Sequence, residues 1–238
     1  AEKGTGYFSL RPAFRLPYPA AAMPRIPRGY SAGHAYHVLN RGSGGAAVFH
    51  TDADYAAFLD LLSAAKAGHP VQIFGFCLMP NHVHLVVQPA TEATLSPFMQ
   101  WWMTSHVRRY HRHYRRHGHV WQGRFKSFSI QQDDHLLTVL RDVLLNPVRA
   151  KLVTHARDWR WSHLQFPALT DPLPISVPTE DPFSLEQPLS SPDLITLRPC
   201  VNRQQPFGTA DWHAKIAATL GLASTLRSRG RPRKSPEK

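Results

Sequence analysis

The sequence predicts an α+β fold in which one antiparallel sheet carries helices on one face. Apolar patterns follow one another between residues 35 and 145 in the order strand, helix, strand, strand, helix, strand, helix. Two β-rich runs, residues 71–79 and 82–88, are separated only by Pro80 and Asn81, which favours an antiparallel hairpin. This order is the split βαβ pattern of ferredoxin-like domains with one extra helix.

The first strand and the first helix are separated by a change of period. Residues 35–40 alternate polar and apolar side chains and run into a glycine-rich turn at residues 41–45. A helix over residues 53–67 is expected to begin after Asp52, a residue type favoured at helix starts, and to end before Pro70.

The remaining elements follow the hairpin. A second helix is expected from Thr94 to about Arg116, and residues 125–130 read as a fourth strand. A third helix is expected over residues 136–145, where Pro147 perturbs its end.

Three segments are expected along the chain. Residues 1–22 mix Gly, Pro and Ala without periodicity and are interpreted as an extension. Residues 23–166 form the folded domain. Residues 167–238 form a C-terminal arm, Pro- and Ser-rich at first, then with a short helix at residues 211–222 and a basic tail.

The charge balance favours a phosphate-bearing partner. The chain has 28 Lys and Arg residues against 16 Asp and Glu, a formal net charge of +12, and arginine suits phosphate groups. No apolar run approaches the roughly 18 residues that span a bilayer, so no membrane contact is expected. Cys77 and Cys200 are too few for a disulfide framework, which makes the cytoplasm the expected compartment.

His82 and His84 form a candidate metal site. Both stand on the second strand of the hairpin, where alternation places their imidazoles on one face and Val83 on the other. They can chelate one divalent ion; the alternative is that they are ordinary histidines, since the chain has 15. An ion that acts on phosphate needs a third protein ligand, which Asp142 and Asn146, four residues apart on one helix face, can supply.

Five segments carry a pattern that resembles a known family. They are Leu78-Met79-Pro80-Asn81-His82-Val83-His84-Leu85, Trp121-Gln122-Gly123-Arg124-Phe125-Lys126-Ser127, Asn146-Pro147-Val148-Arg149-Ala150, Trp159-Arg160-Trp161-Ser162 and the arginine-rich tail from Ser224 to Lys234. In this order they resemble the REP-associated tyrosine transposases, a bacterial single-tyrosine, IS200-like family of His-hydrophobe-His DNA strand-transfer enzymes. The resemblance covers about residues 23–234.

The resemblance implies a ferredoxin-like domain in which His82, His84 and Asn146 hold Mg²⁺ or Mn²⁺ against the scissile phosphate. It also implies a tyrosine that attacks the phosphorus, giving a 5′-phosphotyrosine and a free 3′-hydroxyl. The implied partner is hairpin-forming single-stranded DNA of repetitive extragenic elements, met in the bacterial cytoplasm at the nucleoid. The oligomeric state, monomer or dimer, stays open, and an RNA-binding domain is disfavoured because its strands show no RNA-recognition aromatics.

The chain departs from the family at the catalytic nucleophile. The family's tyrosine stands four residues before the asparagine, where this chain has Asp142. No tyrosine lies within a helical turn of Asn146, which leaves Tyr110 and Tyr114 on the second helix as substitutes. Asp142 is open to three interpretations: a metal ligand, a residue that orients water in a hydrolytic nuclease, or a solvated helix residue. The chain is accordingly a strand transferase or a cleavage-deficient DNA-binding module, engineered or decayed.

A basic block ends the second helix. Residues 108–117 contain five arginines, three histidines and two tyrosines, which mixes phosphate-binding with base-stacking side chains; a solvated helix end is the alternative. The expected DNA-binding residues are Arg108, Arg109, Arg112, Arg115, Arg116, Trp121, Arg124 and Lys126. Trp121 either stacks on a base or, as the favoured interpretation, fills the core. Arg229 and Arg231 in the tail match the core of an AT-hook, which enters an A·T-rich minor groove.

Overall fold

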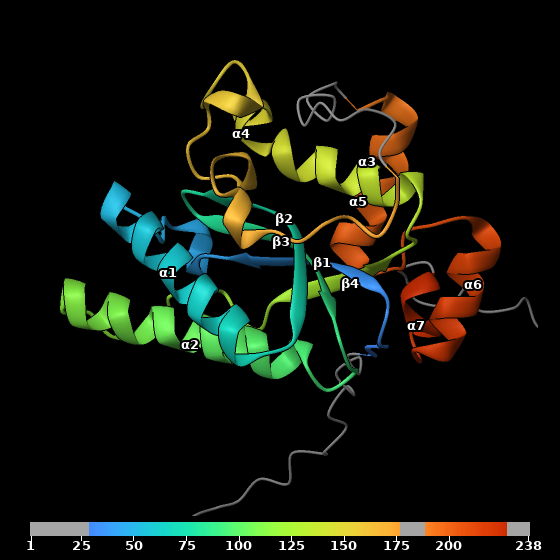
Figure 1. Ribbon diagram of the computed structural model, residues 1–238, viewed down its shortest axis with the longest axis horizontal. Coiled ribbons are helices and arrows are strands. Elements are labelled where there is room, and N and C mark those ends of the chain that lie inside the picture. Colours follow the sequence, from blue (N-terminus) through green and yellow to red (C-terminus); the bar gives the residue numbers. More distant parts are fainter. Residues whose placement is uncertain (1–28, 177–188, 228–238) are drawn as a thin grey trace, which may run out of the picture.

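The computed structural model describes residues 29–176 and 189–227. Four strands form one antiparallel sheet in the order β2-β3-β1-β4 (Figure 1). They are β1 Ala35–Arg41, β2 Val71–Met79, β3 His82–Pro89 and β4 Lys126–Ile130. This sheet confirms the α+β, ferredoxin-like fold, including the β2–β3 hairpin.

Two long helices cover one face of the sheet. They are α1 Asp52–Gly68 and α2 Leu95–Tyr114, which lie side by side below the sheet in Figure 1. Phe58, Leu62 and Trp102 are completely buried in the core between these helices and the sheet. This is the helical face that the sequence predicts.

The opposite face is covered as well, which the sequence did not predict. α3 Asp134–Leu144 and α5 Ser191–Arg203 bury their apolar sides in a second core with side chains such as Val86 and Phe128. The physical reason lies in β2, where Gln72 is the only exposed residue. A strand that is apolar along its whole length requires cover on both of its faces.

α5 lies where the sequence predicted a linker or extended arm over residues 167–201. The hydroxyl of Ser190 accepts a hydrogen bond from the backbone nitrogen of Asp193 (3.2 Å), and Pro192 stands in the first turn, where a missing N–H costs nothing. Pro199 inside the helix interrupts the pattern that would otherwise indicate a helix.

Three shorter helices complete the described chain. α4 Asn146–Arg149 follows α3 across Leu145 and has Pro147 in its first turn. α6 Ala210–Thr219 lies where one short helix was expected over residues 211–222, and α7 Ala223–Leu226 follows that stretch. Within the described ranges, no helix is both long and apolar enough to cross a membrane.

Candidate functional site

His82 and His84 point to the face of the sheet that α3 covers. Their neighbour Val83 is 1% exposed in the core beneath α1 and α2, and successive side chains of a strand point to opposite faces. His84 is buried and His82 is partly exposed. The two ring centroids lie 5.0 Å apart, so the two imidazoles share one face.

The ring of His84 is held by another histidine. Nε2 of His37 and Nδ1 of His84 lie 2.9 Å apart and the two rings stack. The other nitrogen of His84, Nε2, is buried and has no hydrogen-bond partner among the described residues. Burial, and after it the positive potential of His37, His82 and Arg149, lowers the pKa of His84 well below 6.5. His84 is therefore neutral near pH 7 and has a buried nitrogen to offer a ligand.

His82 is oriented by its neighbour Asn81. Nδ1 of His82 lies 2.6 Å from Oδ1 of Asn81. Because that oxygen only accepts, Nδ1 carries the proton and donates, which leaves the lone pair on Nε2. Burial, together with the charge of Arg41, lowers the pKa of His82 to about 4. A neutral imidazole held by its other nitrogen is the form in which histidine binds metals.

Asp142, Asn146 and Arg149 form one network where α3 meets α4. The amide nitrogen of Asn146 and a guanidinium nitrogen of Arg149 each donate to the backbone oxygen of Asp142 (both 2.9 Å). Arg149 also pairs with Oδ1 of Asp142 at 2.9 Å. Asp142 is only 8% exposed, so it is not a solvated helix residue. Burial raises the pKa of Asp142, and the guanidinium of Arg149 opposes that rise.

The donor atoms of three side chains are of the types that bind a divalent ion. His82 keeps the lone pair of Nε2, and His84 offers that of Nε2 in the tautomer whose Nδ1 donates to His37. Asn146 directs its amide nitrogen to a carbonyl, which leaves its oxygen as the group able to coordinate. Across residues 29–176 and 189–227, no three side chains of His, Cys, Asp or Glu are grouped so as to hold a metal. The carboxylate of Asp142 is held by Arg149 instead. Asn146, not Asp142, is thus the candidate third ligand.

Tyr110 and Tyr114 lie on the wrong face to replace the missing nucleophile. Both stand on α2, across the sheet from His84, and Tyr110 belongs to the core of that face. Their hydroxyls are engaged: that of Tyr110 lies 2.9 Å from Nε2 of His50, and that of Tyr114 donates to Asp54 at 2.5 Å. Neither hydroxyl reaches the histidine pair.

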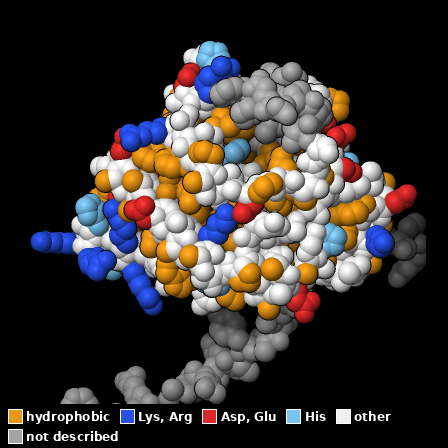
Figure 2. Space-filling view, in the orientation of Figure 1, with side chains coloured by type: hydrophobic (Ala, Val, Ile, Leu, Met, Phe, Trp, Pro, Cys, Tyr) orange, Lys and Arg blue, Asp and Glu red, His pale blue; other side chains and the backbone are white. Residues whose placement is uncertain are grey.

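The basic block on α2 divides into structural and exposed arginines. Arg109 pairs with the buried carboxylate of Asp54 at 3.1 Å, so its charge is used inside the fold. The other four are exposed and form no ion pair with another described residue; they are Arg108, Arg112, Arg115 and Arg116. Figure 2 shows Lys and Arg side chains gathered at the end of the molecule where α2 ends.

Trp121 is a core residue, which corrects its expected role in DNA binding. Its side chain is 6% exposed and packs near Phe58 and His106, with ring centroids 6.0 and 5.3 Å away. A base cannot stack on a ring that is already enclosed. Arg124 and Lys126, in contrast, are exposed. Arg229 and Arg231 lie outside the described residues.

Three residues of the site were missed by the sequence reasoning. His37 orients His84, while Arg41 and Arg149 set the charge around the pair. Arg149 belongs to the Asn146–Ala150 motif and was therefore detectable. His37 and Arg41 were not, because β1 joins β3 only through the strand order of the sheet.

Comparison with known proteins finds one matching family model. Residues 31–141 match the family model described as "Transposase IS200 like". Over these residues, a little under half of the chain, the protein is similar to IS200-like transposases. Because the match ends one residue before Asp142, it does not cover the nucleophile position or Asn146. Comparison with curated proteins finds no match.

Two solved structures are similar to this chain. One is described as the REP-associated tyrosine transposase bound to a REP hairpin; it is 17% identical, covers 70% of this chain and 96% of its own, and gives a TM-score of 0.48. The other is a putative transposase from Deinococcus radiodurans R1; it is 16% identical, covers 54% of this chain and 92% of its own, and gives a TM-score of 0.37.

Proposed function

We propose that this chain binds hairpin-forming single-stranded DNA beside a divalent ion and does not form a covalent tyrosine intermediate. One observation carries the second half of the proposal. At the motif position four residues before Asn146, the chain has a buried carboxylate, Asp142, paired with Arg149. A carboxylate is repelled by a phosphate and forms only a labile acyl phosphate, so it is a poor substitute for a phenol.

The residues of the site have separate roles in this proposal. His82 and His84 would supply imidazole nitrogens, and Asn146 an amide oxygen, to Mg²⁺ or Mn²⁺. An ion held there would polarise a phosphate oxygen. Arg41 and Arg149 lie close enough to the histidines to lower their pKa values, and the same positive potential attracts a DNA phosphate.

Recognition of the hairpin is assigned to the exposed end of α2. Four exposed arginines without ion pairs to described residues can contact successive phosphates, which gives affinity without base specificity. Arg124 extends this surface into the loop after α2. The AT-hook segment with Arg229 and Arg231 adds a second, tethered contact.

The test is a covalent-adduct assay with the full chain, a labelled DNA hairpin and Mn²⁺, analysed on a denaturing gel. The native chain should give no protein–DNA adduct, whereas Asp142→Tyr should give one because a residue there lies one helical turn before Asn146. Asp142→Phe is the matched control, with the same ring and no hydroxyl, and should give none.

Two results would overturn the proposal. An adduct formed by the native chain, and lost in Tyr110→Phe or Tyr114→Phe, would place the nucleophile on α2. Metal-dependent cleavage by the native chain without any adduct, lost in Asp142→Asn, would make the protein a hydrolytic nuclease.

A further inference from the structure

A second cationic surface lies far along the chain from the α2 arginines. A groove of about 630 Å³ runs beside β4 and the outward side of α5. Its lining residues are Lys126, Ile195, Arg198, Pro199, Asn202 and Arg203. We call it the α5 groove.

The charge of the α5 groove suits a polyanion. It is lined by three cations and no carboxylate. Lys126, Arg198 and Arg203 form no ion pair with any other residue that the structure describes. Grouped cations without internal partners repel one another, and phosphate groups relieve that repulsion. Ile195, 67% exposed beside them, offers an apolar surface on which a base or sugar can pack.

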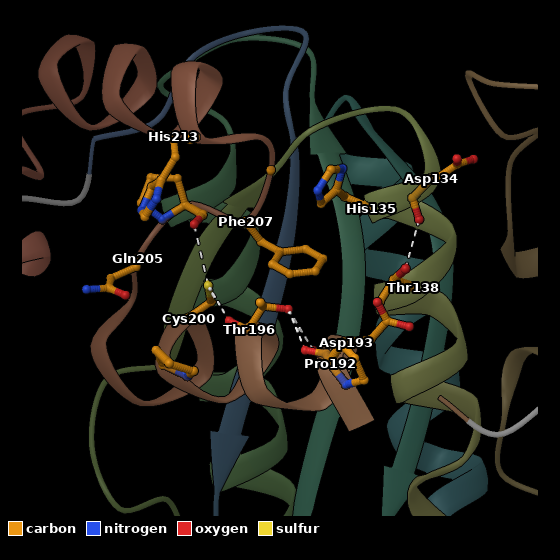
Figure 3. Close-up of a pocket in the computed structure, with 14 residues that line it drawn as sticks. Asp134, His135, Thr138, Pro192, Asp193, Thr196, Cys200, Gln205, Phe207 and His213 are labelled. Carbon is orange, nitrogen blue, oxygen red and sulfur yellow. Dashed lines mark hydrogen bonds between the residues drawn. The ribbon is translucent and has the colours of Figure 1, made fainter. Parts of the chain in front are cut away.

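The other side of α5 has the opposite character. It borders a cavity of about 560 Å³ that it shares with the start of α3, and Asp134 and Asp193 line that cavity (Figure 3). The sulfhydryl of Cys200 on this side is occupied by backbone oxygens. The two carboxylates disfavour phosphate, so a nucleic acid strand is directed to the outward side, where Arg198 lies.

The α5 groove is connected to the histidine pair across the sheet. Lys126 is the register partner of Leu39, and Leu39 is the register partner of His84. Residues directly opposite one another in an antiparallel pair point to the same face, so all three side chains lie on the α3 face. Two strand spacings separate the Cα atoms of Lys126 and His84 by about 10 Å. Leu39 between them is partly exposed, so solvent reaches this face.

We propose that the α5 groove binds the phosphate backbone of a DNA single strand that flanks the hairpin and leads to the His82–His84 site. The inference rests on the proposed function, since the site supplies the reason for a strand to cross this face. It adds a second binding surface, for unpaired DNA, to the hairpin-binding surface assigned to α2. The α5 groove would thus bind the single strand next to the point where it joins the hairpin.

The test compares the affinity of the full chain for a blunt hairpin with its affinity for the same hairpin carrying a single-stranded extension at the 5′ or the 3′ end. Fluorescence anisotropy is measured over a range of salt concentrations. One of the two extensions should tighten binding and steepen the plot of log K against log[salt] by about 2, from three phosphates at about 0.7 each. The triple variant Lys126→Gln, Arg198→Gln, Arg203→Gln should lose this gain.

The charge-matched control is Arg112→Gln, Arg115→Gln, Arg116→Gln at and just after the end of α2, which should keep the gain from the extension. Circular dichroism melting checks that both triple variants fold. If the hairpin binds and neither extension adds affinity, or if the α5 variant keeps the gain, the α5 groove does not bind DNA. If the native chain binds no hairpin, the proposed function is wrong and this inference with it.

Discussion

Two buried carboxylates on opposite faces of the sheet each pair with an arginine, yet their pKa values move in opposite directions. Burial raises the pKa of Asp54, but hydrogen bonds from Tyr114, Arg109 and two backbone nitrogens outweigh it, so the net pKa is lowered. Asp142 has Arg149 alone, and burial keeps its pKa raised. The carboxylate with many hydrogen bonds is stabilised in its charged form, whereas the carboxylate with one arginine partner is not.

Two buried histidines, His106 and His84, also lie on opposite faces of the sheet and differ in their surroundings. His106, on the α2 face, is 1% exposed, and burial lowers its pKa to about 4. Its neighbours are the aromatic rings of Phe49, Phe58 and Trp121, and neither of its nitrogens has a partner among the described residues. His84 is 6% exposed, and beside it lies a second histidine, His82. An unpartnered buried nitrogen therefore indicates a metal site only where its neighbours supply further ligands.

The largest effect that separates the two faces is expected for Asp54→Asn. Removing one partner of a buried ion pair typically costs 3–5 kcal/mol, and since Arg109 is a quarter exposed we expect about 3 kcal/mol. The measurement is urea unfolding at pH 7. The comparison variant, Asp142→Asn, should cost about 1 kcal/mol or less, because the charged form of Asp142 is disfavoured by burial. An equal loss of unfolding free energy in the two variants would show that the two carboxylates contribute equally to stability.

The contributions of Asp54 and Asp142 to stability should depend on pH in opposite directions. A lowered folded-state pKa means that the stability from Asp54 is present above its unfolded pKa, near 3.8, and is lost as the pH falls through the folded value. The difference in unfolding free energy between the native chain and Asp54→Asn should therefore shrink below about pH 4. A raised pKa makes any contribution of Asp142 decline as the pH rises, so a native-to-Asp142→Asn difference that grows from pH 4 to pH 7 would contradict the account.

The elements of the sheet were largely predictable, and the second covered face was not. Period-2 and helical patterns placed β1 to β4, α1 and α2 to within a few residues, because each element has an amphipathic or apolar run of its own. α5 was missed because Pro199 breaks its pattern, although Ser190 and Pro192 mark its start. Trp121 stood among the expected DNA-binding residues, beside the favoured core interpretation, because a motif carries no information on burial.

The candidate site was predictable only as far as the motifs extend. His82, His84, Asp142 and Asn146 stand in local patterns whose spacing fixes their direction. The hydrogen bond of His37 to His84 depends on β1 lying beside β3, and the pairing of Arg109 with Asp54 depends on α2 packing on α1. Such contacts between distant segments require the three-dimensional structure.

A smaller effect, on the salt dependence of hairpin binding, should distinguish the exposed arginines at the end of α2 from Arg109, which is paired inside the fold. Replacing Arg108, Arg112, Arg115 and Arg116 by Gln should flatten the plot of log K against log[salt] for hairpin binding, without a change in stability. The slope should fall by about 0.7 for each DNA phosphate that an arginine no longer neutralises. Fluorescence anisotropy and thermal unfolding measure the two quantities. An unaltered slope would remove the end of α2 from the DNA interface.

The smallest effect is expected for the tail. Deleting residues 228–238 removes Arg229 and Arg231 and should weaken hairpin binding several-fold without abolishing it, because a tethered second contact adds to the first. The affinity of the truncated chain is compared with that of the full chain at one salt concentration. Equal affinities would discard the AT-hook interpretation.

The central claim is that the α3 face holds a metal site and the α2 face does not. Calorimetric titration of Mn²⁺ into the native chain, His84→Phe and His106→Phe tests it directly, with circular dichroism to confirm folding. Loss of a residue that merely supports a ligand weakens metal binding roughly 10–100-fold, so loss of His84 should cost at least that much. We predict one ion per native chain, unchanged affinity in His106→Phe and that loss in His84→Phe. Equal affinities in the native chain and His84→Phe, or no binding by the native chain, would contradict the account.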